Sequence, residues 1–411
     1  MKILQYIGFT DIINSVGGAE RSFCLMANAL AAKGHEVYAV CKSIHAGLPF
    51  FPLDDRVQFI NVGNTGHREC KPLSWRISRP FRFIAPKMWD QHIGEPFNKK
   101  KAKKPMEPFH RLIREVQPDV VIPWSVSDYL SMYAHSMPNV PVILTTRGNA
   151  QNFIAPINTQ ESMVKINTCP HLHVLQRSFV PEVEKIYRGS IHVIPNTVPQ
   201  LEDKDLADLR SEKPQKTITM VARLDPTKQQ HLLIQAFEHL AKDYSDWKVE
   251  IYGPLNEHEG AKGRFPEYLR QLNEMIVSLG NINQVKLMGA TSTPLEVLRK
   301  ADIFAFPSNH PEGFPRALSE AMATGLPCVG LKSTPSVNDL IVDGVNGFLT
   351  DNTPDDFAAK LKILMDDQNL RIKMGKAGHE MMKEYAHEKV WDQWEDLITT
   401  VVQQHRQRKT A

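Results

Sequence analysis

Residues 2–41 read KILQYIGFTDIINSVGGAERSFCLMANALAAKGHEVYAVC, and this stretch decides the class of fold. Its first eight residues, 2–9, form a short apolar run rich in strand-forming side chains. A helix is expected over 18–33, because apolar side chains recur at the spacing of one helical face: Phe23, Met26, Ala27 and Leu30. Gly34 is expected to end this helix, and 36–41 is a second strand. Strand, helix and strand form a βαβ unit, which predicts a parallel sheet.

The alternation of strands and helices continues along the chain. Apolar runs of strand length recur in the first half at four places: 119–124, 140–147, 171–176 and 191–196. A polar and charged segment at 200–215 follows, and it is expected to be a linker. The alternation then restarts, with strands at 217–223, 249–253, 285–289, 303–308 and 327–331. Helices are expected between these strands at 228–244, 266–280, 293–301 and 315–325.

This pattern predicts two Rossmann-like, doubly wound α/β domains that face an interdomain cleft. The first domain is expected at 1–200 and the second at 201–385. A C-terminal helix at 386–411 is expected to return toward the first domain. Because ligands of open parallel sheets bind at the carboxyl ends of the strands, the loops at those ends are expected to carry the chemistry.

Composition excludes several classes of protein. The 411 residues include 49 Lys and Arg against 46 Asp and Glu, and this net charge of +3 argues against a protein built to wrap nucleic acid. No apolar run approaches the roughly 20 residues that span a bilayer, and the N-terminal stretch is not expected to be a signal peptide. The five cysteines are scattered and form no CxxC pair, which indicates reduced thiols in a cytoplasmic protein and no zinc site.

The loop after the strand at 303–308 combines an acid with the start of a helix. Glu312 lies in this loop, and Glu320 lies about two turns inside the helix. Gly313 permits a close backbone approach to a ligand, and Pro315 suits the first helical turn. The free N–H groups of that turn and the helix dipole favour a phosphate, so a site for a phosphorylated sugar is one interpretation. A solvated loop acid beside an ordinary helix start is the other.

The stretch EGFPRALSEAMATGLP at 312–327 resembles the signature of the retaining glycosyltransferases of family 4, which have the GT-B fold. That signature is a Glu, seven residues and a second Glu, here Glu312 and Glu320. Four further segments are similar to family segments: GGAER at 17–21, VIPNTV at 193–198, VARLDPTKQQHLLIQAF at 221–237 and DGVNGFL at 343–349. The resemblance covers essentially the whole chain, and it rests on the combination of these segments in order.

The resemblance implies a role for each matching residue on the donor side. Arg223 and Lys228 would clamp the diphosphate of a sugar nucleotide, and Glu312 would bind hydroxyls of the donor sugar, so these three form the catalytic group. The other donor-binding positions would contact the phosphates, the sugar or, for the second Glu, the ribose: Gly17, Gly18, Gly313, Phe314, Pro315 and Glu320. From the residues alone, alternatives stay open, namely cations on a solvated helix start, a helix-surface acid and glycines of a plain tight turn.

The resemblance also implies the reaction. A hexose or N-acetylhexosamine would move from a nucleotide-diphosphate sugar, most commonly a UDP-sugar in this family, to an acceptor hydroxyl with retention at the anomeric carbon. Cations and a helix dipole would stabilise the leaving diphosphate, and neither a metal nor a cofactor is expected. The acceptor is expected in lipopolysaccharide, capsule or lipid-linked glycan assembly. Two alternatives are a soluble sugar or sugar-phosphate acceptor and a non-catalytic sugar-nucleotide-binding protein on the same fold.

The loop after 119–124 departs from the family pattern. Many members carry a His there, near the sugar, whereas this loop has no His and contains Ser125 and Asp128. Some bacterial members are similar to this chain in having Ser in the loop and an Arg and an Asn after the next strand, here Arg147 and Asn149. Ser125, Arg147 and Asn149 are therefore candidates for the acceptor side or the reacting centre. For Arg147, a structural arginine that pairs with a core carboxylate is an equal alternative.

Residues 68–104 form a basic and aromatic insert. This insert holds eleven Lys and Arg against three Asp and Glu, so the rest of the chain carries a net charge of −5. Its large aromatic side chains are Trp75, Phe81, Phe83, Trp89 and Phe97. Basic residues interleaved with Trp and Phe are typical of a segment that docks on anionic lipid, so a peripheral position on the inner face of the membrane is expected. Nucleic-acid binding and a merely solvated loop are the alternatives.

Overall fold

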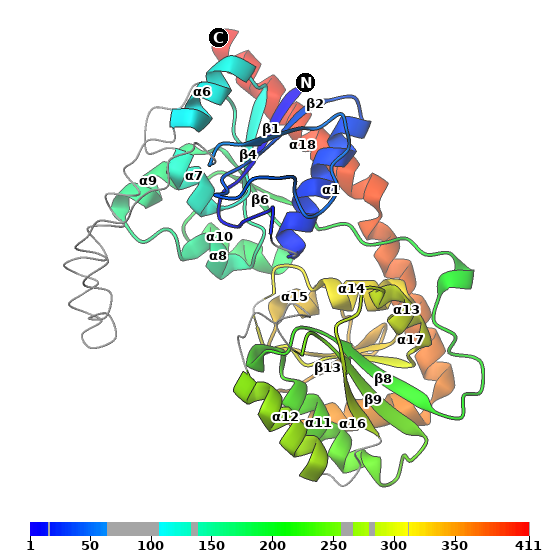
Figure 1. The fold of residues 1–411 in the computed structure, drawn as a ribbon. Helices are drawn as coiled ribbons and strands as arrows, with labels where there is room; N and C mark the ends of the chain where they lie inside the picture. The colour runs from blue at the N-terminus through cyan, green and yellow to red at the C-terminus, as the bar shows by residue number, and fades with distance from the viewer. Residues whose placement is uncertain are drawn as a thin grey trace, which may run out of the picture. The chain divides into compact units, whose positions relative to one another are not determined.

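Figure 1 shows the fold of the chain, a computed structural model that describes residues 1–14, 17–63, 107–132, 139–255, 266–278, 284–310 and 312–410. The chain divides into two compact units. The first unit comprises Met1–Val174, Glu182–His192 and Gln393–Ala411, and the second comprises Leu175–Pro181 and Val193–Asp392. The basic insert expected at 68–104 lies outside the described residues.

The first unit contains a parallel sheet in the order β3-β2-β1-β4. Its strands are β1 (Lys2–Ile7), β2 (Glu36–Cys41), β3 (Gln58–Asn61) and β4 (Val120–Pro123). β1 is central, because Ile3 pairs with Val37 on one side and with Val120 on the other. A bridge between Val121 and Val142 leads to a second set of strands, β5-β6-β7. These are β5 (Leu144–Thr145), β6 (His171–Val174) and β7 (Ser190–Val193).

The helix α1 (Gly18–Ala32) follows β1 and packs its predicted apolar face inward. The four side chains that predicted this face are all fully buried, which confirms the helix: Phe23, Met26, Ala27 and Leu30. Gly34 has a φ of +84°, the left-handed conformation with which glycine ends many helices. The next helices along the chain are α6 (Glu107–Val116), α7 (Val126–Met132), α8 (Ala150–Ile154), α9 (Gln160–Thr168) and α10 (Val180–Glu184).

The second unit contains a six-stranded sheet in the order β10-β9-β8-β11-β12-β13, and all its neighbouring strands are parallel. Its strands are β8 (Lys216–Val221), β9 (Trp247–Tyr252), β10 (Val285–Gly289), β11 (Ile303–Phe306), β12 (Cys328–Leu331) and β13 (Gly347–Thr350). β8 and β11 are neighbours, with Ile303 opposite Ile218. The order of strands reverses at this pair, and open parallel sheets bind their ligands beyond such a switch point.

Helices pack on both faces of this second sheet around a core that includes Phe237, Trp247 and Phe357 (Figure 1). They are α11 (Gln230–Ala241), α12 (Pro266–Ser278), α13 (Pro294–Lys300), α14 (Arg316–Ala323), α15 (Pro335–Asn338), α16 (Pro354–Asp366) and α17 (Gln368–Met382). Short 3-10 turns are η2 (Arg177–Phe179), η3 (Asp203–Asp205), η4 (Pro226–Lys228) and η6 (Lys383–Tyr385). Within the described ranges, no helix is long and apolar enough to cross a membrane.

The last helix, α18 (His387–Thr410), contributes to both units, because its residues from Gln393 onward cluster with the first unit. Trp394 is fully buried there. Glu395 forms an ion pair with Lys33 at 2.8 Å. One face of this helix therefore supplies part of the core of the first unit.

The class of fold expected from the sequence, two α/β domains with parallel sheets, is confirmed. Two strands, β3 and β13, were not expected. The strand expected at 140–147 is reduced to the two-residue β5, with only a single bridge at Val142 before it. These differences concern strands of two to four residues, whose apolar runs are too short to set a clear period.

The segment at 200–215 was expected to be a linker, and this expectation is wrong. The backbone N of Ala207 donates to the carbonyl of Thr324 at 2.8 Å, and Leu209 is only 6% exposed. The segment therefore packs as part of the second unit. Its side chains are polar because the segment lies on the surface of the unit, and not because it lacks tertiary contacts.

Candidate active site

The loop after β8 positions a lysine at the carboxyl end of the sheet in the second unit. The start of η4 is fixed by Asp225, whose Oδ1 accepts a hydrogen bond from the backbone N of Thr227 at 2.9 Å. Gln229 takes a left-handed conformation, with φ of 52°, and turns the chain into α11. Lys228 is held between these two turns with only 8% of its surface exposed.

Lys228 forms an ion pair with Glu312, which lies in the loop after β11. Their side chains are 11% and 17% exposed, so water screens the pair only in part. Ser308 donates a further hydrogen bond to Oε1 of Glu312 at 3.1 Å. The sequence predicted both residues as donor ligands, and the structure brings them together. That they bind each other was not predicted.

Arg223 also follows β8, but its side chain is exposed. Its guanidinium makes no hydrogen bond or ion pair with the residues that the structure describes. Its backbone carbonyl accepts a hydrogen bond from Nε2 of the fully buried Gln230 at 2.7 Å. The loop is therefore fixed through its backbone, and the guanidinium is available to an anion.

The helix α14 begins at Arg316, one residue later than expected, and Pro315 is its N-cap. Glu320 lies on this helix with a side chain that is 12% exposed, and Arg316 donates a hydrogen bond to it at 3.3 Å. The alternative of a fully solvated helix-surface acid therefore does not describe Glu320. A carboxylate in this position can accept hydrogen bonds from hydroxyls.

Phe314, in the predicted donor loop, is 7% exposed and packs against Tyr385, with ring centroids 5.8 Å apart. Its side chain therefore anchors the loop to the second unit. Gly313 precedes it and is half-buried. Contact of these two residues with a donor stays a prediction that concerns their backbone N–H groups.

Gly17 and Gly18 begin α1 in the first unit. Gly17 has a φ of −80°, which any residue adopts, so conformation does not require glycine here. A Cβ on Gly17 would lie 2.2 Å from Oε2 of Glu20, the end of a side chain that would have to shift. Glu20 is buried and accepts a hydrogen bond from Thr10. Contact of Gly17 with a donor phosphate stays a prediction.

Ser125 caps α7, because its Oγ accepts a hydrogen bond from the backbone N of Asp128 at 3.0 Å. The side chain of Asp128 reaches the end of β1, where its Oδ1 accepts from the backbone N of Gly8 at 3.1 Å. Asp128 is 4% exposed, and its Oδ2 is buried without a partner among the described residues. Burial raises the pKa of Asp128 to about 7, outweighing the hydrogen bonds from Ser125 and Gly8, which lower it. Sequence reasoning noted this acid and missed its burial, which a polar loop does not signal.

Arg147 follows β5 and lies between two tryptophan rings. Its Cζ is 3.7 Å from the ring centre of Trp124 and 5.1 Å from that of Trp394. Its Nη2 donates to Sδ of Met26 at 3.3 Å, and its Nε is buried without a partner. Burial lowers the pKa of Arg147 to about 9. No carboxylate pairs with Arg147 in the described part of the chain, so the described residues do not supply the core acid that the structural alternative requires.

Asn149 caps α8 in a reciprocal arrangement with Asn152. Its Oδ1 accepts from the backbone N of Asn152 at 3.1 Å, and its own backbone N donates to Oδ1 of Asn152 at 3.0 Å. The structure therefore explains Asn149 by a capping role. Its contact with an acceptor stays a prediction.

Asp203 and Asp205 form an Asp-x-Asp pair, a spacing of carboxylates that can hold a divalent cation. They lie in η3, where Asp205 pairs with Arg299 at 3.3 Å. Across the described ranges, no group of three or more His, Cys, Asp or Glu side chains is placed to hold a metal ion. The geometry of this pair therefore fits a surface ion pair.

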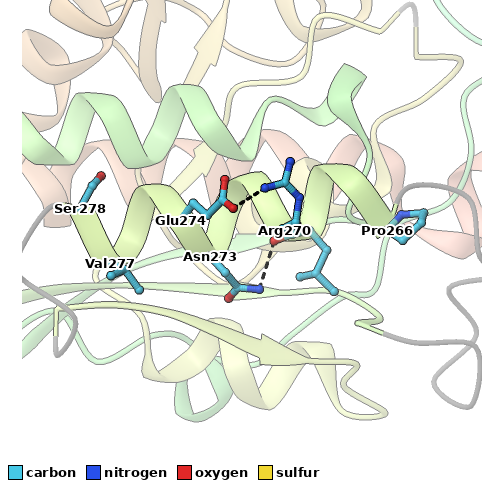
Figure 2. A pocket seen from close by; sticks show the side chains of 7 residues that line it. Pro266, Arg270, Asn273, Glu274, Val277 and Ser278 are labelled. Carbon is cyan, nitrogen blue, oxygen red and sulfur yellow. Dashed lines mark hydrogen bonds and ion pairs between the residues drawn. The ribbon is translucent and has the colours of Figure 1, made fainter.

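A surface hollow of about 580 Å³ lies along α12. Figure 2 shows its lining, in which Arg270 pairs with Glu274, and Asn273 donates to the carbonyl of Leu269. All of its lining residues come from this one helix, and none is a predicted donor or acceptor residue. The hollow is therefore not part of the candidate site.

Two family models match the chain in succession, Glycosyltransferase Family 4 over residues 16–200 and Glycosyl transferases group 1 over residues 202–381. An uncharacterized glycosyltransferase of Haemophilus influenzae is 25% identical over 96% of this chain and 100% of that protein. An exopolysaccharide phosphotransferase of Streptomyces coelicolor is 27% identical, and the match covers 98% of this chain but 41% of that protein. A poly(ribitol-phosphate) α-N-acetylglucosaminyltransferase of Staphylococcus aureus is 28% identical over 45% of this chain and 36% of that protein.

Solved structures share the fold over nearly the whole chain. A glycosyltransferase of Rickettsia africae matches with a TM-score of 0.72 and 17% identity, over 98% of both chains. Anabaena HepE in complex with UDP and glucose matches with a TM-score of 0.65 and 18% identity, over 97% of this chain and 100% of that one. A lipopolysaccharide outer core galactosyltransferase matches with a TM-score of 0.66 and 16% identity, over 97% and 99%.

The two parallel α/β units and these structural matches define the class of protein, a glycosyltransferase of the GT-B fold. The chain belongs to the group 1 glycosyltransferases of the family 4 type, because the two family models together cover most of its length. The family expected from the residues 312–327 is therefore confirmed.

Proposed function

We propose that the chain is a retaining glycosyltransferase that moves a hexose or N-acetylhexosamine from a UDP-sugar to a hydroxyl of a cell-surface glycan. The observation that carries the proposal is the pairing of Lys228 with Glu312 after β8 and β11, with the exposed Arg223 on the same loop as the lysine. A sugar diphosphate needs cations for its phosphates and oxygen acceptors for its hydroxyls. These three side chains supply both at the carboxyl ends of the central strands.

Binding of the donor is proposed to separate the ion pair. A diphosphate carries more negative charge than one carboxylate, so it competes for Lys228, and Arg223 provides a second cation. Glu312 is then released to accept hydrogen bonds from hydroxyls of the donor sugar. The cations stabilise the charge that develops on the leaving diphosphate, which is the largest contribution in catalysis of this kind.

The proposed reaction breaks the bond between the anomeric carbon and the diphosphate oxygen and forms a bond between that carbon and the acceptor oxygen on the same face. The proton of the acceptor hydroxyl leaves with the diphosphate. Glu320 is proposed to accept hydrogen bonds from the ribose hydroxyls and so to position the nucleotide. The backbone N–H groups of Gly17, Gly18, Gly313 and Phe314 are proposed to contact the phosphates or the sugar.

The relatives support these substrate classes. Anabaena HepE was solved with UDP and glucose, and the Staphylococcus relative is named for the transfer of N-acetylglucosamine to poly(ribitol phosphate). A third protein of the same fold is a lipopolysaccharide galactosyltransferase. These names support our proposal of an acceptor in lipopolysaccharide, capsule or lipid-linked glycan assembly.

A donor screen tests the proposal. The full chain is heated with UDP-, GDP- and ADP-sugars, because a ligand that binds the folded state raises the melting temperature by mass action. Nucleotide release is then measured with the stabilising donor, and the anomeric configuration of the product is read by NMR. Stabilisation by a UDP-sugar and a product with the donor's configuration are expected. A product with inverted anomeric configuration would contradict the retaining mechanism. Stabilisation by a sugar nucleotide without nucleotide release in the presence of any glycan acceptor would favour a non-catalytic binding protein.

The same assay tests independence of metals. Addition of EDTA is expected to leave the rate of nucleotide release unchanged, because the proposed stabilisation of the diphosphate comes from Arg223 and Lys228. A rate that EDTA abolishes and Mg²⁺ or Mn²⁺ restores would contradict this part of the proposal and would direct attention to Asp203 and Asp205.

We also propose that residues 68–104 dock the protein on an anionic membrane surface, at the inner face of the membrane. Their basic and aromatic composition supports this. Large apolar side chains are also exposed after β2 in the first unit, namely Ile44 (85%), Leu48 (75%) and Phe50 (59%). Flotation of the chain with anionic vesicles is expected to fall at high salt and on replacing five lysines by Ser: Lys99, Lys100, Lys101, Lys103 and Lys104. Equal flotation with neutral vesicles would contradict the proposal.

A further inference from the structure

The guanidinium of Arg147 is an unusual cation in the first unit, because tryptophan rings and a thioether lie against it and no acid of the described residues pairs with it. Trp124 comes from the end of β4 and Trp394 from α18, with ring centres 3.7 and 5.1 Å from its Cζ. Met26 on α1 accepts the hydrogen bond from Nη2 through its sulfur. Three separate segments of the unit therefore converge on one positive charge.

This arrangement leaves the charge only partly compensated. A ring face attracts a guanidinium, but sulfur is a weak acceptor, and Nε of Arg147 has no partner among the described residues. Two further buried donors in the same cluster, Nε2 of Gln5 and Nε1 of Trp394, also lack partners in the described ranges. The side-chain oxygen of Gln5 accepts from Trp124, so these residues contact one another. The cluster thus has an excess of positive charge and N–H donors, and a buried cation without an anion is costly.

A purely structural role does not account for this. An unbranched apolar side chain such as Met would fill the space between two rings without the cost of removing a charge from water. The guanidinium lies over the ring of Trp124, and its planar fork suits the oxygens of a phosphate or carboxylate. Arg147 remains partly exposed at the carboxyl end of β5, where ligands of parallel sheets bind.

We propose that Arg147 binds an oxyanion of the acceptor, a phosphate or a carboxylate, and so selects acidic glycans. This inference rests on the proposed function. The donor diphosphate already has two cations, Arg223 and Lys228, in the second unit. Because Arg223 and Lys228 suffice for the charge of the diphosphate, we assign the anion at Arg147 to the acceptor. Trp124 and Trp394 act as positioning residues that hold the guanidinium.

The test measures binding of small acids by tryptophan fluorescence, since both rings touch the guanidinium. The full chain is titrated with glycerol phosphate, glucuronate and uncharged glycerol, with and without saturating UDP. The variants are Arg147→Met, which removes the charge, and Arg147→Lys, which keeps the charge and loses the fork. The control is Arg406→Met, which removes an exposed arginine paired with Asp119 in the same unit. Melting temperatures establish that each variant is folded.

We expect glycerol phosphate or glucuronate to bind the wild type about tenfold or more tightly than Arg147→Met, as loss of a charge-assisted hydrogen bond predicts. Glycerol is expected to give no response, Arg147→Lys to be intermediate and Arg406→Met to match the wild type. Binding of the phosphate alone would identify a phosphorylated acceptor, and binding of glucuronate would identify a uronic acid. Equal binding by the wild type and Arg147→Met would overturn the proposal, as would loss of acid binding in the presence of UDP.

These results are separable from the proposed function. If the wild type turns over a sugar nucleotide but shows no Arg147-dependent binding of acids, the acceptor site is contradicted and the proposed glycosyltransferase activity stands. If the wild type binds the acids through Arg147 but neither binds nor turns over a sugar nucleotide, the proposed activity is contradicted and the anion site stands. With a glycan acceptor in hand, Arg147→Met should raise the acceptor KM and leave the donor KM unchanged.

Discussion

Lys228 and Glu312 bind each other, although 84 positions separate them in the sequence. Their ion pair joins the loop after β8 to the loop after β11, the two central strands of the second sheet. Because both side chains are largely removed from water, each protects the other from being an unpaired charge. The pair therefore stabilises the two loops, and under the proposed function a donor would separate it to use both residues.

The first prediction concerns single substitutions at this pair. Lys228→Met and Glu312→Gln are each expected to lower kcat/KM for transfer by about a hundredfold or more, because each removes a group that stabilises the transition state. Each is also expected to lower the free energy of unfolding by about 1–3 kcal/mol, because it leaves a partly buried partner without its hydrogen bond. Nucleotide release and urea unfolding measure the two effects.

The double variant Lys228→Met with Glu312→Gln is the control. It is expected to recover part of the lost stability, since no unpaired charge is left, and none of the activity. A double variant whose loss of stability equals the sum of the two single losses would show that the ion pair does not couple the loops.

The second prediction concerns Glu320 and the ribose. Glu320→Gln is expected to weaken donor binding about tenfold, because an amide accepts hydrogen bonds less strongly than a carboxylate. The comparison of UDP with 2′-deoxy-UDP and 3′-deoxy-UDP, measured by calorimetry, identifies the contact. If Glu320 binds a ribose hydroxyl, the variant should discriminate less than the wild type against the nucleotide that lacks it. Unchanged discrimination against both deoxy nucleotides would show that Glu320 does not bind the ribose.

Much of the fold could be predicted because its signals are local. The buried face of α1 follows from four apolar side chains at helical spacing, and the longer strands follow from apolar runs. The strands β3 and β13 have four residues each and were not predicted. The segment 200–215 is polar, yet the buried Leu209 and the hydrogen bond from Ala207 to Thr324 hold it in the second unit. Contacts of this kind are tertiary and leave no period in the sequence.

The site shows the same limit. The resemblance to family 4 provided the residue types on the donor side, but the pairing of Lys228 with Glu312 depends on the neighbouring positions of β8 and β11. The surroundings of Arg147 depend on Trp394, which is far away in the sequence and comes from the last helix. The burial of Asp128 depends on its bond to Gly8 at the end of β1. Each of these contacts depends on the order of the strands in the sheets and on the packing of distant segments, which no local sequence pattern specifies.

The third prediction separates two roles of Asn149. Asn149→Ala removes the cap of α8 and is expected to lower the free energy of unfolding by about 1 kcal/mol. Asn149→Asp keeps an oxygen that can accept from the backbone N of Asn152, so its stability should be close to that of the wild type. Urea unfolding measures both. If capping is the whole role, Asn149→Asp also restores activity, whereas an acceptor contact made by the amide would leave Asn149→Asp as slow as Asn149→Ala.

The fourth prediction concerns pH and Asp128. The pKa of this acid is raised from 3.8 to about 7 by burial, so between these values the folded chain keeps a proton that the unfolded chain releases. The free energy of unfolding therefore falls as pH rises through this window, by up to about 4 kcal/mol at 1.36 kcal/mol per pH unit. Asp128→Asn stays neutral at every pH. It is expected to raise the melting temperature at pH 5, where part of the window has been crossed, and to raise it further at pH 8.

Asp119 provides a control of opposite sign in the same unit. Burial alone would raise its pKa, but hydrogen bonds from the backbone of Lys2 and from Arg406 outweigh it and lower the pKa below 3.8. Its stabilising effect is therefore present above about pH 4 and is lost as pH falls through the lowered pKa. Asp119→Asn should lower the melting temperature at both pH 5 and pH 8, while Asp128→Asn raises it at both and by more at pH 8. If Asp119→Asn and Asp128→Asn both lower the melting temperature at pH 8, Asp128 is not a destabilising buried carboxylate at that pH, and the prediction is wrong.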